Sequence, residues 1–199
     1  MSKDGYLTEK DLLKPGNMVL MYARGAFPMA DETGKLDWYM PETRTIIPLN
    51  NFNVPRSLKK FYLESNFVYK FDNATIEVIQ NCANRDSTWI SGELIKAYKG
   101  LQKLGHLHSV EVYDEDNLVG GLYGVTYRGA FFGESMFSKV SQASKCALIK
   151  LIEHLREKKF ALLDVQYQTD HLKMFGATEI DFDSFQSILS VSYSVDTTF

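Results

Sequence analysis

The chain has 199 residues, of which 45% are apolar and 13% aromatic, so it can form one ordinary domain with a small appendage rather than a disordered protein. Its formal net charge is −3, whereas a dedicated nucleic-acid-binding protein is usually basic. Its two cysteines, Cys82 and Cys146, have no metal-ligand or disulfide spacing, and no stretch approaches the ~18 apolar residues of a membrane helix, so we expect a cytoplasmic protein with buried thiols.

The first fifty residues have an irregular pattern. Pro15 suits the first position of a helix that continues over residues 17–24, and Gly25 ends it. Residues 26–41 contain prolines and glycine among aromatic residues, which predicts a loop with a tight turn. Residues 43–49 are rich in β-branched side chains and predict a strand.

From residue 50 onward, regular helices and strands are predicted. Helices are expected over 55–63, 74–84 with Asn73 as the cap, 92–104, 143–159, 169–175 and 183–190. Strands are expected over 67–71, 109–113, 117–127, 130–138, 160–166 and 178–181. Antiparallel strands followed by a long helix and a further strand predict an α/β (α+β) fold with an open mixed sheet, compatible with an N-acetyltransferase-like core.

The segment from Phe132 to Ser138 has the pattern of a ligand site. In a regular strand, Glu134, Met136 and Ser138 would share one face. A carboxylate beside an apolar lining suits a ligand that carries a cationic amine and an apolar side chain. The alternative is a solvated glutamate on an edge strand.

The strand that ends at Gln166 carries a second pair of polar residues. Asp164 and Gln166 would project to one face, and Leu163 and Val165 to the other. Polar groups at the end of an apolar strand often mark a cleft, although they can also face plain solvent.

A cluster of positive charge is predicted on the helix over 55–63. Arg56, Lys59 and Lys60 are three and four residues apart, so they fall on one helical face. Such a face is commonly just solvated, but a local basic patch can contact phosphates even in a mildly acidic protein. His106 and His108 alternate at a strand entry without a third ligand nearby, so no metal site is predicted.

Nine stretches of the sequence, taken in order, resemble the leucyl/phenylalanyl-tRNA–protein transferase family. They are YARGAFP (22–28), WYMPETR (38–44), RSLKKF (56–61), TWI (88–90), LGHLHSVEV (104–112), LVGGLYGV (118–125), FGESMFS (132–138), ASK (143–145) and DVQ (164–166). A single stretch would be weak evidence, whereas the ordered set is highly specific. Met29 and Tyr39 stand where the family commonly has tryptophan.

The resemblance implies an N-acetyltransferase-like catalytic domain over 51–199 after a small N-terminal domain over 1–50. It also implies transfer of Leu, Phe and, less well, Met from aminoacyl-tRNA to proteins that begin with Arg or Lys, which are then degraded through the N-degron pathway. A cytoplasmic monomer without a metal or organic cofactor is expected.

The resemblance also implies roles for individual residues. Asp164 and Gln166 match a catalytic relay, and Glu134 matches an acid that orients the substrate amines. The remaining matches are substrate-binding residues and a patch for the tRNA acceptor stem. Met136 matches the pocket for the transferred side chain, Ser135 is a further substrate-binding residue, and Trp38 and Trp89 match positions near the aminoacyl-adenosine. The patch for the tRNA consists of Arg56, Lys59 and Lys60. Because a neutral amide is a weak base, we expect Gln166 to align the amine, polarised by Asp164.

Two alternatives remain open from the sequence. A coenzyme A-dependent N-acetyltransferase would need a backbone nest for the pyrophosphate before the long helix, and residues 138–144 contain no glycine there. A tRNA- or peptide-binding adaptor without activity is the other alternative, which the presence of Glu134, Asp164 and Gln166 disfavours.

Overall fold

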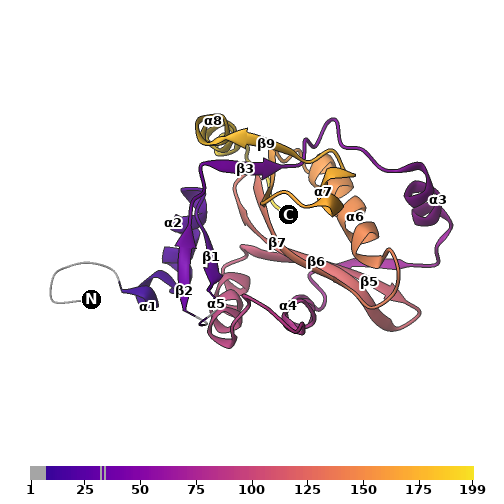
Figure 1. Cartoon of the computed structure of the whole chain (residues 1–199), viewed down its shortest axis with the longest axis horizontal. Helices are drawn as coiled ribbons and strands as arrows, with labels where there is room; N and C mark the ends of the chain where they lie inside the picture. The colour runs from indigo at the N-terminus through magenta and orange to yellow at the C-terminus, as the bar shows by residue number, and fades with distance from the viewer. Residues whose placement is uncertain (1–7, 32, 34) are drawn as a thin grey trace.

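A seven-stranded mixed sheet forms the centre of the protein in the computed structural model, which describes residues 8–31, 33 and 35–199 (Figure 1). The strand order is β4-β5-β6-β7-β8-β3-β9. β7 and β8 run parallel, and the other neighbours in this described sheet run antiparallel. The bounds are β3 (Thr43–Ile46), β4 (Val68–Phe71), β5 (Leu107–Asp114), β6 (Asn117–Tyr127), β7 (Ala130–Ser138), β8 (Leu162–Gln166) and β9 (Thr178–Asp181). The predicted α/β class with a mixed sheet is confirmed.

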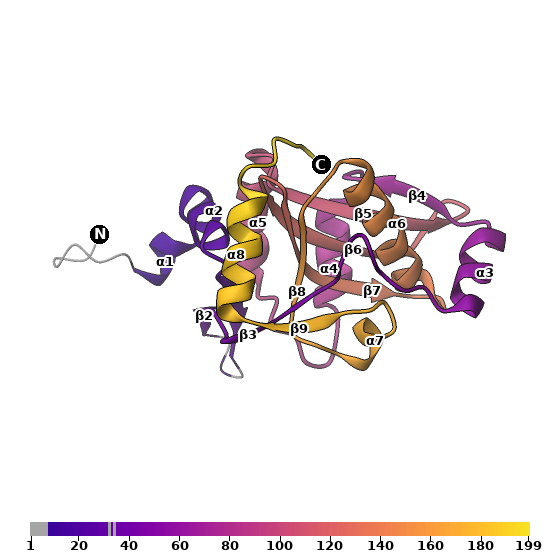
Figure 2. The same cartoon turned by 90° about the horizontal axis from the view of Figure 1, so that it is seen from above.

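Helices cover both faces of this sheet, as Figures 1 and 2 show. α6 lies on one face, and α4 and α5 lie on the other. The bounds are α3 (Arg56–Glu64), α4 (Thr75–Ala83), α5 (Gly92–Lys103), α6 (Ala143–Glu157), α7 (Asp170–Lys173) and α8 (Phe182–Ser192). Among the described residues, none of these helices has the length and apolar character needed to cross a membrane.

The apolar face predicted for the long helix is buried against the sheet. Leu151 and Leu155 are at most 1% exposed, and burial of each stabilises the fold by about 1.5–3 kcal/mol. At the start of α6, a Cβ on Gly120 of β6 would lie 2.5 Å from the Cβ of Ala143. Glycine at position 120 therefore lets the helix approach the sheet closely at this end.

The N-terminal part contains α1 (Glu9–Leu12), α2 (Pro15–Ala23) and a separate two-stranded sheet of β1 (Phe27–Ala30) and β2 (Leu36–Tyr39). The predicted helix is confirmed, with Gly25 in the left-handed conformation just after it. The loop predicted over 26–41 is wrong, because β1 and β2 pair from Phe27 opposite Tyr39 onward. Pro28 is tolerated because a two-stranded sheet has only edge strands.

The start of α4 shows a contact that local sequence does not reveal. The predicted cap at Asn73 is wrong, because its side chain donates to the Tyr113 hydroxyl at 3.1 Å. The Ala74 backbone N–H instead donates to the carboxylate of Glu111 on β5, also at 3.1 Å. A residue of a distant strand thus accepts the hydrogen bond of a backbone N–H at the start of this helix.

Candidate active site

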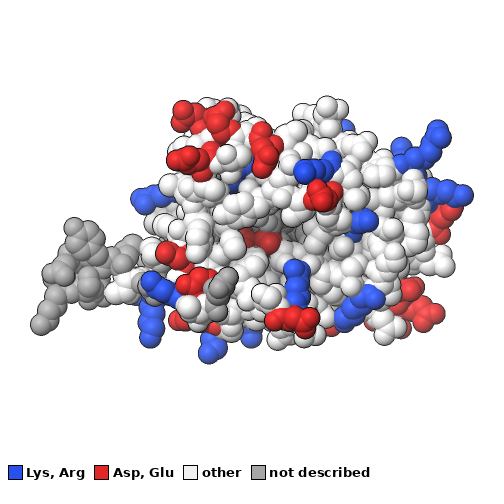
Figure 3. Space-filling model, viewed as in Figure 1, with Lys and Arg blue, Asp and Glu red and all other residues white. Residues whose placement is uncertain are grey.

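A cavity of about 330 Å³ opens where β7 and β8 separate (Figure 3). The two strands are paired from Ala130 opposite Leu162 to Phe132 opposite Asp164. Beyond that point both continue without pairing to each other, and residues 133–136 and 165–166 line the cavity. Glu134 is the only carboxylate among the described residues of the lining, and acidic atoms are visible at the floor of the hollow in Figure 3.

A β-bulge aims Glu134 into this cavity. On β6, Tyr123 lies opposite Ser135 and Gly124 lies opposite Gly133, so Glu134 is the extra residue of β7 without a partner. Consecutive residues of β7 therefore line the cavity, and the simple alternation predicted for this segment is wrong. The alternative of a solvated edge-strand glutamate is also wrong, because β7 is an inner strand and Glu134 is only partly exposed.

Two tyrosines hold the Glu134 carboxyl group. The Tyr22 hydroxyl donates to Oε1 at 3.0 Å, and the Tyr98 hydroxyl donates to Oε2 at 2.9 Å. Burial raises the pKa of Glu134 to about 7, while the two tyrosine hydrogen bonds act in the opposite direction. This carboxyl group can therefore change its charge near neutral pH.

Asp164 lies below the cavity and is fully buried rather than facing solvent. Its carboxylate forms a two-bond ion pair with Arg44, with Nε to Oδ1 at 2.9 Å and Nη2 to Oδ2 at 2.6 Å. Arg44 also donates to the Gly25 carbonyl at 2.7 Å, and its guanidinium carbon lies 4.7 Å from the centre of the Phe27 ring and 4.5 Å from that of Phe185. Asp164 thus has a strong partner that the sequence pattern did not suggest.

Gln166 contacts Asp164 through its backbone. Its N–H donates to Asp164 Oδ1 at 3.0 Å, and its φ of 59° lies in the left-handed region. A non-glycine residue in this conformation costs of order 1–3 kcal/mol and persists where its surroundings impose it. The Gln166 side chain lines the cavity, and its buried Nε2 has no hydrogen-bond partner in the described protein.

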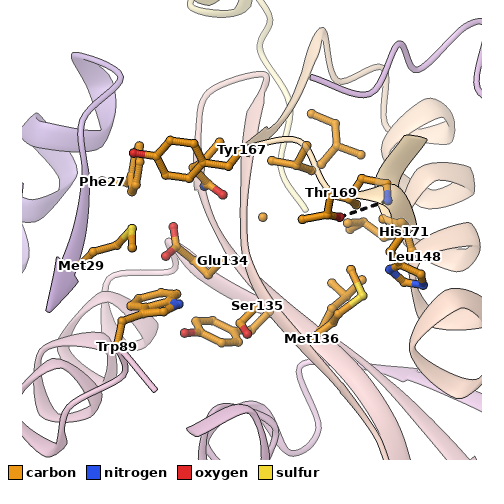
Figure 4. Close-up of a pocket in the computed structure, with 18 of the residues that line it drawn as sticks. Phe27, Met29, Trp89, Glu134, Ser135, Met136, Leu148, Tyr167, Thr169 and His171 are labelled. Atoms are coloured by element: carbon orange, nitrogen blue, oxygen red, sulfur yellow. Dashed lines mark hydrogen bonds between the residues drawn. The ribbon is translucent and has the colours of Figure 1, made fainter. Parts of the chain in front are cut away.

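The cavity has two chemically different ends, visible in Figure 4. Met29 and Trp89 lie with Glu134 toward one end, and Met136 lies at the other. Leu148, Thr169 and His171 lie near Met136. The whole lining includes six aliphatic side chains: Leu122, Leu148, Leu151, Leu163, Val165 and Leu172. An apolar recess therefore adjoins a polar region with one carboxyl group.

Other predicted site residues lie at varying distances from this cavity. Ser135 is part of its lining, whereas Trp38 lies behind Tyr22, with ring centroids 5.6 Å apart in an edge-on arrangement. The exposed Arg56, Lys59 and Lys60 lie on α3, at the far end of the molecule from the N-terminal part, and none of them lines the cavity (Figure 1).

The histidines of the predicted strand entry have separate partners. The Nδ1 of His106 bonds the Thr126 carbonyl at 2.9 Å, and the Nδ1 of His108 bonds Asp72 at 2.8 Å. Cys82 and Cys146 are buried free thiols, as predicted.

Sequence reasoning missed several residues of the site. Arg44 pairs with Asp164 across the fold, and Tyr22 and Tyr98 bind Glu134. Tyr123 is fully buried beside Tyr98, with ring centroids 5.5 Å apart, and lines the cavity. Tyr22, Arg44 and Tyr123 do fall within the stretches that carry the family resemblance, and this was the available sequence signal for them. Their partners lie too far away in the chain for a local pattern to reveal.

The family models and the relatives that match this chain carry the same family description. The family described as "Leucyl/phenylalanyl-tRNA protein transferase" matches residues 46–190, and "Leucyl/phenylalanyl-tRNA protein transferase N-terminal domain" matches residues 11–42. Three relatives named leucyl/phenylalanyl-tRNA–protein transferase are 44–45% identical to this chain. They come from Salinibacter ruber (90% of this chain, 80% of the relative), Gluconobacter oxydans (93% and 85%) and Herpetosiphon aurantiacus (94% and 98%).

Proposed function

The chain belongs to the leucyl/phenylalanyl-tRNA protein transferase family and is an aminoacyltransferase, and we propose that it acts on acceptor proteins whose first residue is Arg or Lys. The proposal includes Leu and Phe as preferred transferred residues, Met as a poorer one, and degradation of the products through the N-degron pathway. Family membership also disfavours the coenzyme A-dependent alternative.

One observation carries this proposal: a single cavity combines many apolar side chains with one carboxyl group and the Gln166 amide nitrogen, which has no partner in the described protein. The aliphatic recess suits the side chain of the transferred residue. The polar groups of the lining, which include Glu134, the Tyr123 hydroxyl and the Gln166 amide, suit the amines and the ester. Buried polar atoms without a partner are costly, so a ligand that pairs with them gains affinity.

In the proposed reaction, the α-amine of the acceptor attacks the aminoacyl carbonyl carbon. An amide bond forms, the ester bond to the ribose breaks, and the proton lost by the amine goes to the ribose oxygen. An α-amine has a pKa of roughly 7.7–8.0, so an appreciable fraction is already neutral at cytosolic pH. Catalysis then depends mainly on positioning, which can supply about 7–11 kcal/mol.

Gln166 is the residue assigned to align the attacking amine through its amide oxygen. Asp164 is a positioning residue, because its hydrogen bond reaches the Gln166 backbone and its charge is paired with Arg44. This contact differs from the expected polarisation of the Gln166 side chain by Asp164. Glu134, when ionised, is the assigned partner of a substrate amine.

The recess supports a preference for larger apolar side chains. An aliphatic pocket discriminates against a missing methylene by only about 1–3 kcal/mol, so transfer of the flexible Met side chain is expected at a lower rate. Trp89 lies near Met29 and Glu134 in the same cavity, and it is assigned to the terminal adenosine. The α3 residues Arg56, Lys59 and Lys60 are assigned to the acceptor stem of the tRNA.

The proposed division into two domains places their boundary earlier in the chain than the expected residue 50. β3 falls before residue 50, yet it pairs with β8 and β9 in the central sheet. The small N-terminal domain is therefore proposed to end before Thr43, and the catalytic domain to begin with β3.

A label-transfer assay tests this function. Radiolabelled Leu-tRNA and a peptide that begins with Arg are incubated with the protein, and a peptide that begins with Ala serves as the matched acceptor control. Transfer to the Arg peptide alone, abolished by ribonuclease, is the expected result. Transfer of acetyl label from acetyl-CoA, or binding of Leu-tRNA without transfer, would contradict the proposal.

A further inference from the structure

A second cavity, of about 440 Å³, adjoins the first one on the side of α4 and α7. Arg85, Met136 and His171 line both cavities, so these side chains form the border between the two. The other lining residues come from the end of α4, the end of β7 and the first turn of α6: Asn81, Asn84, Phe137, Ser138, Lys139 and Ser144.

The charged side chains in the described lining of this second cavity are all positive, whereas the first cavity also contains Glu134. Arg85 and Lys139 line it, and the lining that the structure describes contains no carboxylate. Amide and hydroxyl groups make up most of the remaining polar surface. His171 adds no fixed charge, because burial lowers its pKa. The cavity therefore favours an anionic group with several hydrogen-bond acceptors.

Arg85 is held in place at the border between the two cavities. Its Nη2 donates to Ser135 Oγ at 3.0 Å and to the Met136 carbonyl at 2.5 Å. These bonds fix the guanidinium on the β7 wall. A guanidinium that is already oriented loses less conformational freedom on binding an anion.

The side chains, rather than the start of α6, account for the anion preference. The Ser144 backbone N–H already donates to Ser138 Oγ at 3.1 Å, and the Ser138 hydroxyl donates to the Val140 carbonyl. This backbone group is therefore already paired. Lys139 is exposed, with its Nζ 5.7 Å from the centre of the Phe137 ring, and its ammonium can move to a ligand.

We propose that this second cavity binds the phosphodiester group that precedes the terminal adenosine of the aminoacyl-tRNA. The inference rests on the proposed function, because a nucleic acid whose ester lies in the first cavity must leave it through a continuous path. The acceptor protein is a poor occupant, since its α-amine and its first side chain are both cationic. α3 lies at the far end of the molecule, so its basic patch is assigned to the stem, and Arg85 and Lys139 are the cations available near the 3′ end (Figure 1).

The experiment compares two substrates that differ in this phosphate. Leu-tRNA carries it, whereas leucyl-adenosine, the ester without any phosphate, lacks it. Transfer to an Arg peptide is measured with each substrate for wild type, Lys139→Ala and Lys139→Arg. Lys99→Ala on α5 is the matched control, because Lys99 is an exposed lysine that lines neither cavity.

For Leu-tRNA, Lys139→Ala should raise KM by roughly threefold to tenfold, with Lys139→Arg close to wild type. In Lys139→Ala, the plot of log Kd for tRNA against log salt concentration should become less steep by about 0.7. This is the contribution of one contact to a single-stranded phosphate. Leucyl-adenosine should show no change. An unchanged KM and salt slope in Lys139→Ala, or an equal loss with both substrates, would overturn the inference. Failure of wild type to use either substrate would instead refute the proposed function.

Discussion

Arg44 and Asp164, which are 120 residues apart in the sequence, form a two-bond ion pair that is closed off from solvent beneath the cavity. The pair joins β3 to β8, and the Arg44 guanidinium also bonds the carbonyl of Gly25 just after α2. Asp164 in turn accepts the backbone N–H of Gln166. One buried contact therefore links the N-terminal part, the central sheet and the strand end that enters the site.

Removal of Arg44 should be strongly destabilising. Arg44→Ala leaves the Asp164 charge buried without a partner, which should lower the free energy of unfolding by about 3–5 kcal/mol. The double variant Arg44→Met/Asp164→Leu should cost less, because no charge remains buried. Urea unfolding followed by circular dichroism measures both. Arg56→Ala, at an exposed arginine, is the control and should change the free energy of unfolding by no more than about 0.5 kcal/mol. If Arg44→Ala lowered the free energy of unfolding by no more than this control does, the stabilising role of the pair would be refuted.

Changes at Asp164 should affect turnover more than tRNA binding. Asp164→Ala removes the bond to the Gln166 backbone, and a shift of the amine-aligning group by about 1 Å can reduce kcat roughly 100-fold. The KM for Leu-tRNA should stay near the wild-type value. Both variants leave the Arg44 charge buried without a counter-charge, so Asp164→Asn, which preserves volume and one acceptor oxygen, should be the less destabilised of the two and should show the smaller loss of kcat. Full turnover in both variants would remove Asp164 from the mechanism.

Gln166 offers a test that separates catalysis from stability. Gln166→Gly removes the amide and relieves the left-handed backbone, so the free energy of unfolding should stay unchanged or rise by up to about 1 kcal/mol. The kcat should fall by roughly 100-fold because the amine is no longer aligned. The nearby Gln168→Gly serves as the control and should retain turnover. A stable Gln166→Gly protein with wild-type kcat would exclude a catalytic role for this side chain.

The raised pKa of Glu134 predicts how stability depends on pH. Between the ordinary value of 4.5 and about 7, the unfolded chain ionises this group while the folded protein keeps it protonated. The contribution is therefore fully present below pH 4.5 and is lost as pH rises through about 7, with a total of up to roughly 3 kcal/mol.

Glu134→Gln should remove this pH dependence, as measured by thermal unfolding at a series of pH values. The same substitution should remove the inflection near pH 7 from kcat/KM for an Arg peptide, because a neutral amide gains no charge to hold the amine. An unchanged slope of stability between pH 4.5 and 7 in the variant would show that another group titrates there.

Local patterns predicted long and regular elements well. The apolar face of α6 and the bounds of β9 are as expected, because both depend on the periodicity of a few neighbouring residues. The paired strands β1 and β2 were missed, because Pro28 and Pro41 favour a loop prediction when the pairing of the two strands is not known. The cap of α4 failed for a related reason: Glu111, its actual partner, is on β5.

The sequence by itself determined the α/β class, the family and the segments that carry Glu134, Asp164 and Gln166, because hydrophobic periodicity and ordered motifs are properties of neighbouring residues. Only the tertiary structure decided that β7 and β8 separate beyond Phe132 and Asp164, that a bulge turns Glu134 into the gap, and that Arg44 neutralises Asp164. Each of these features depends on the register between strands and on contacts between distant residues. The contacts that stabilise them form only when the chain folds, so a local sequence pattern cannot predict them.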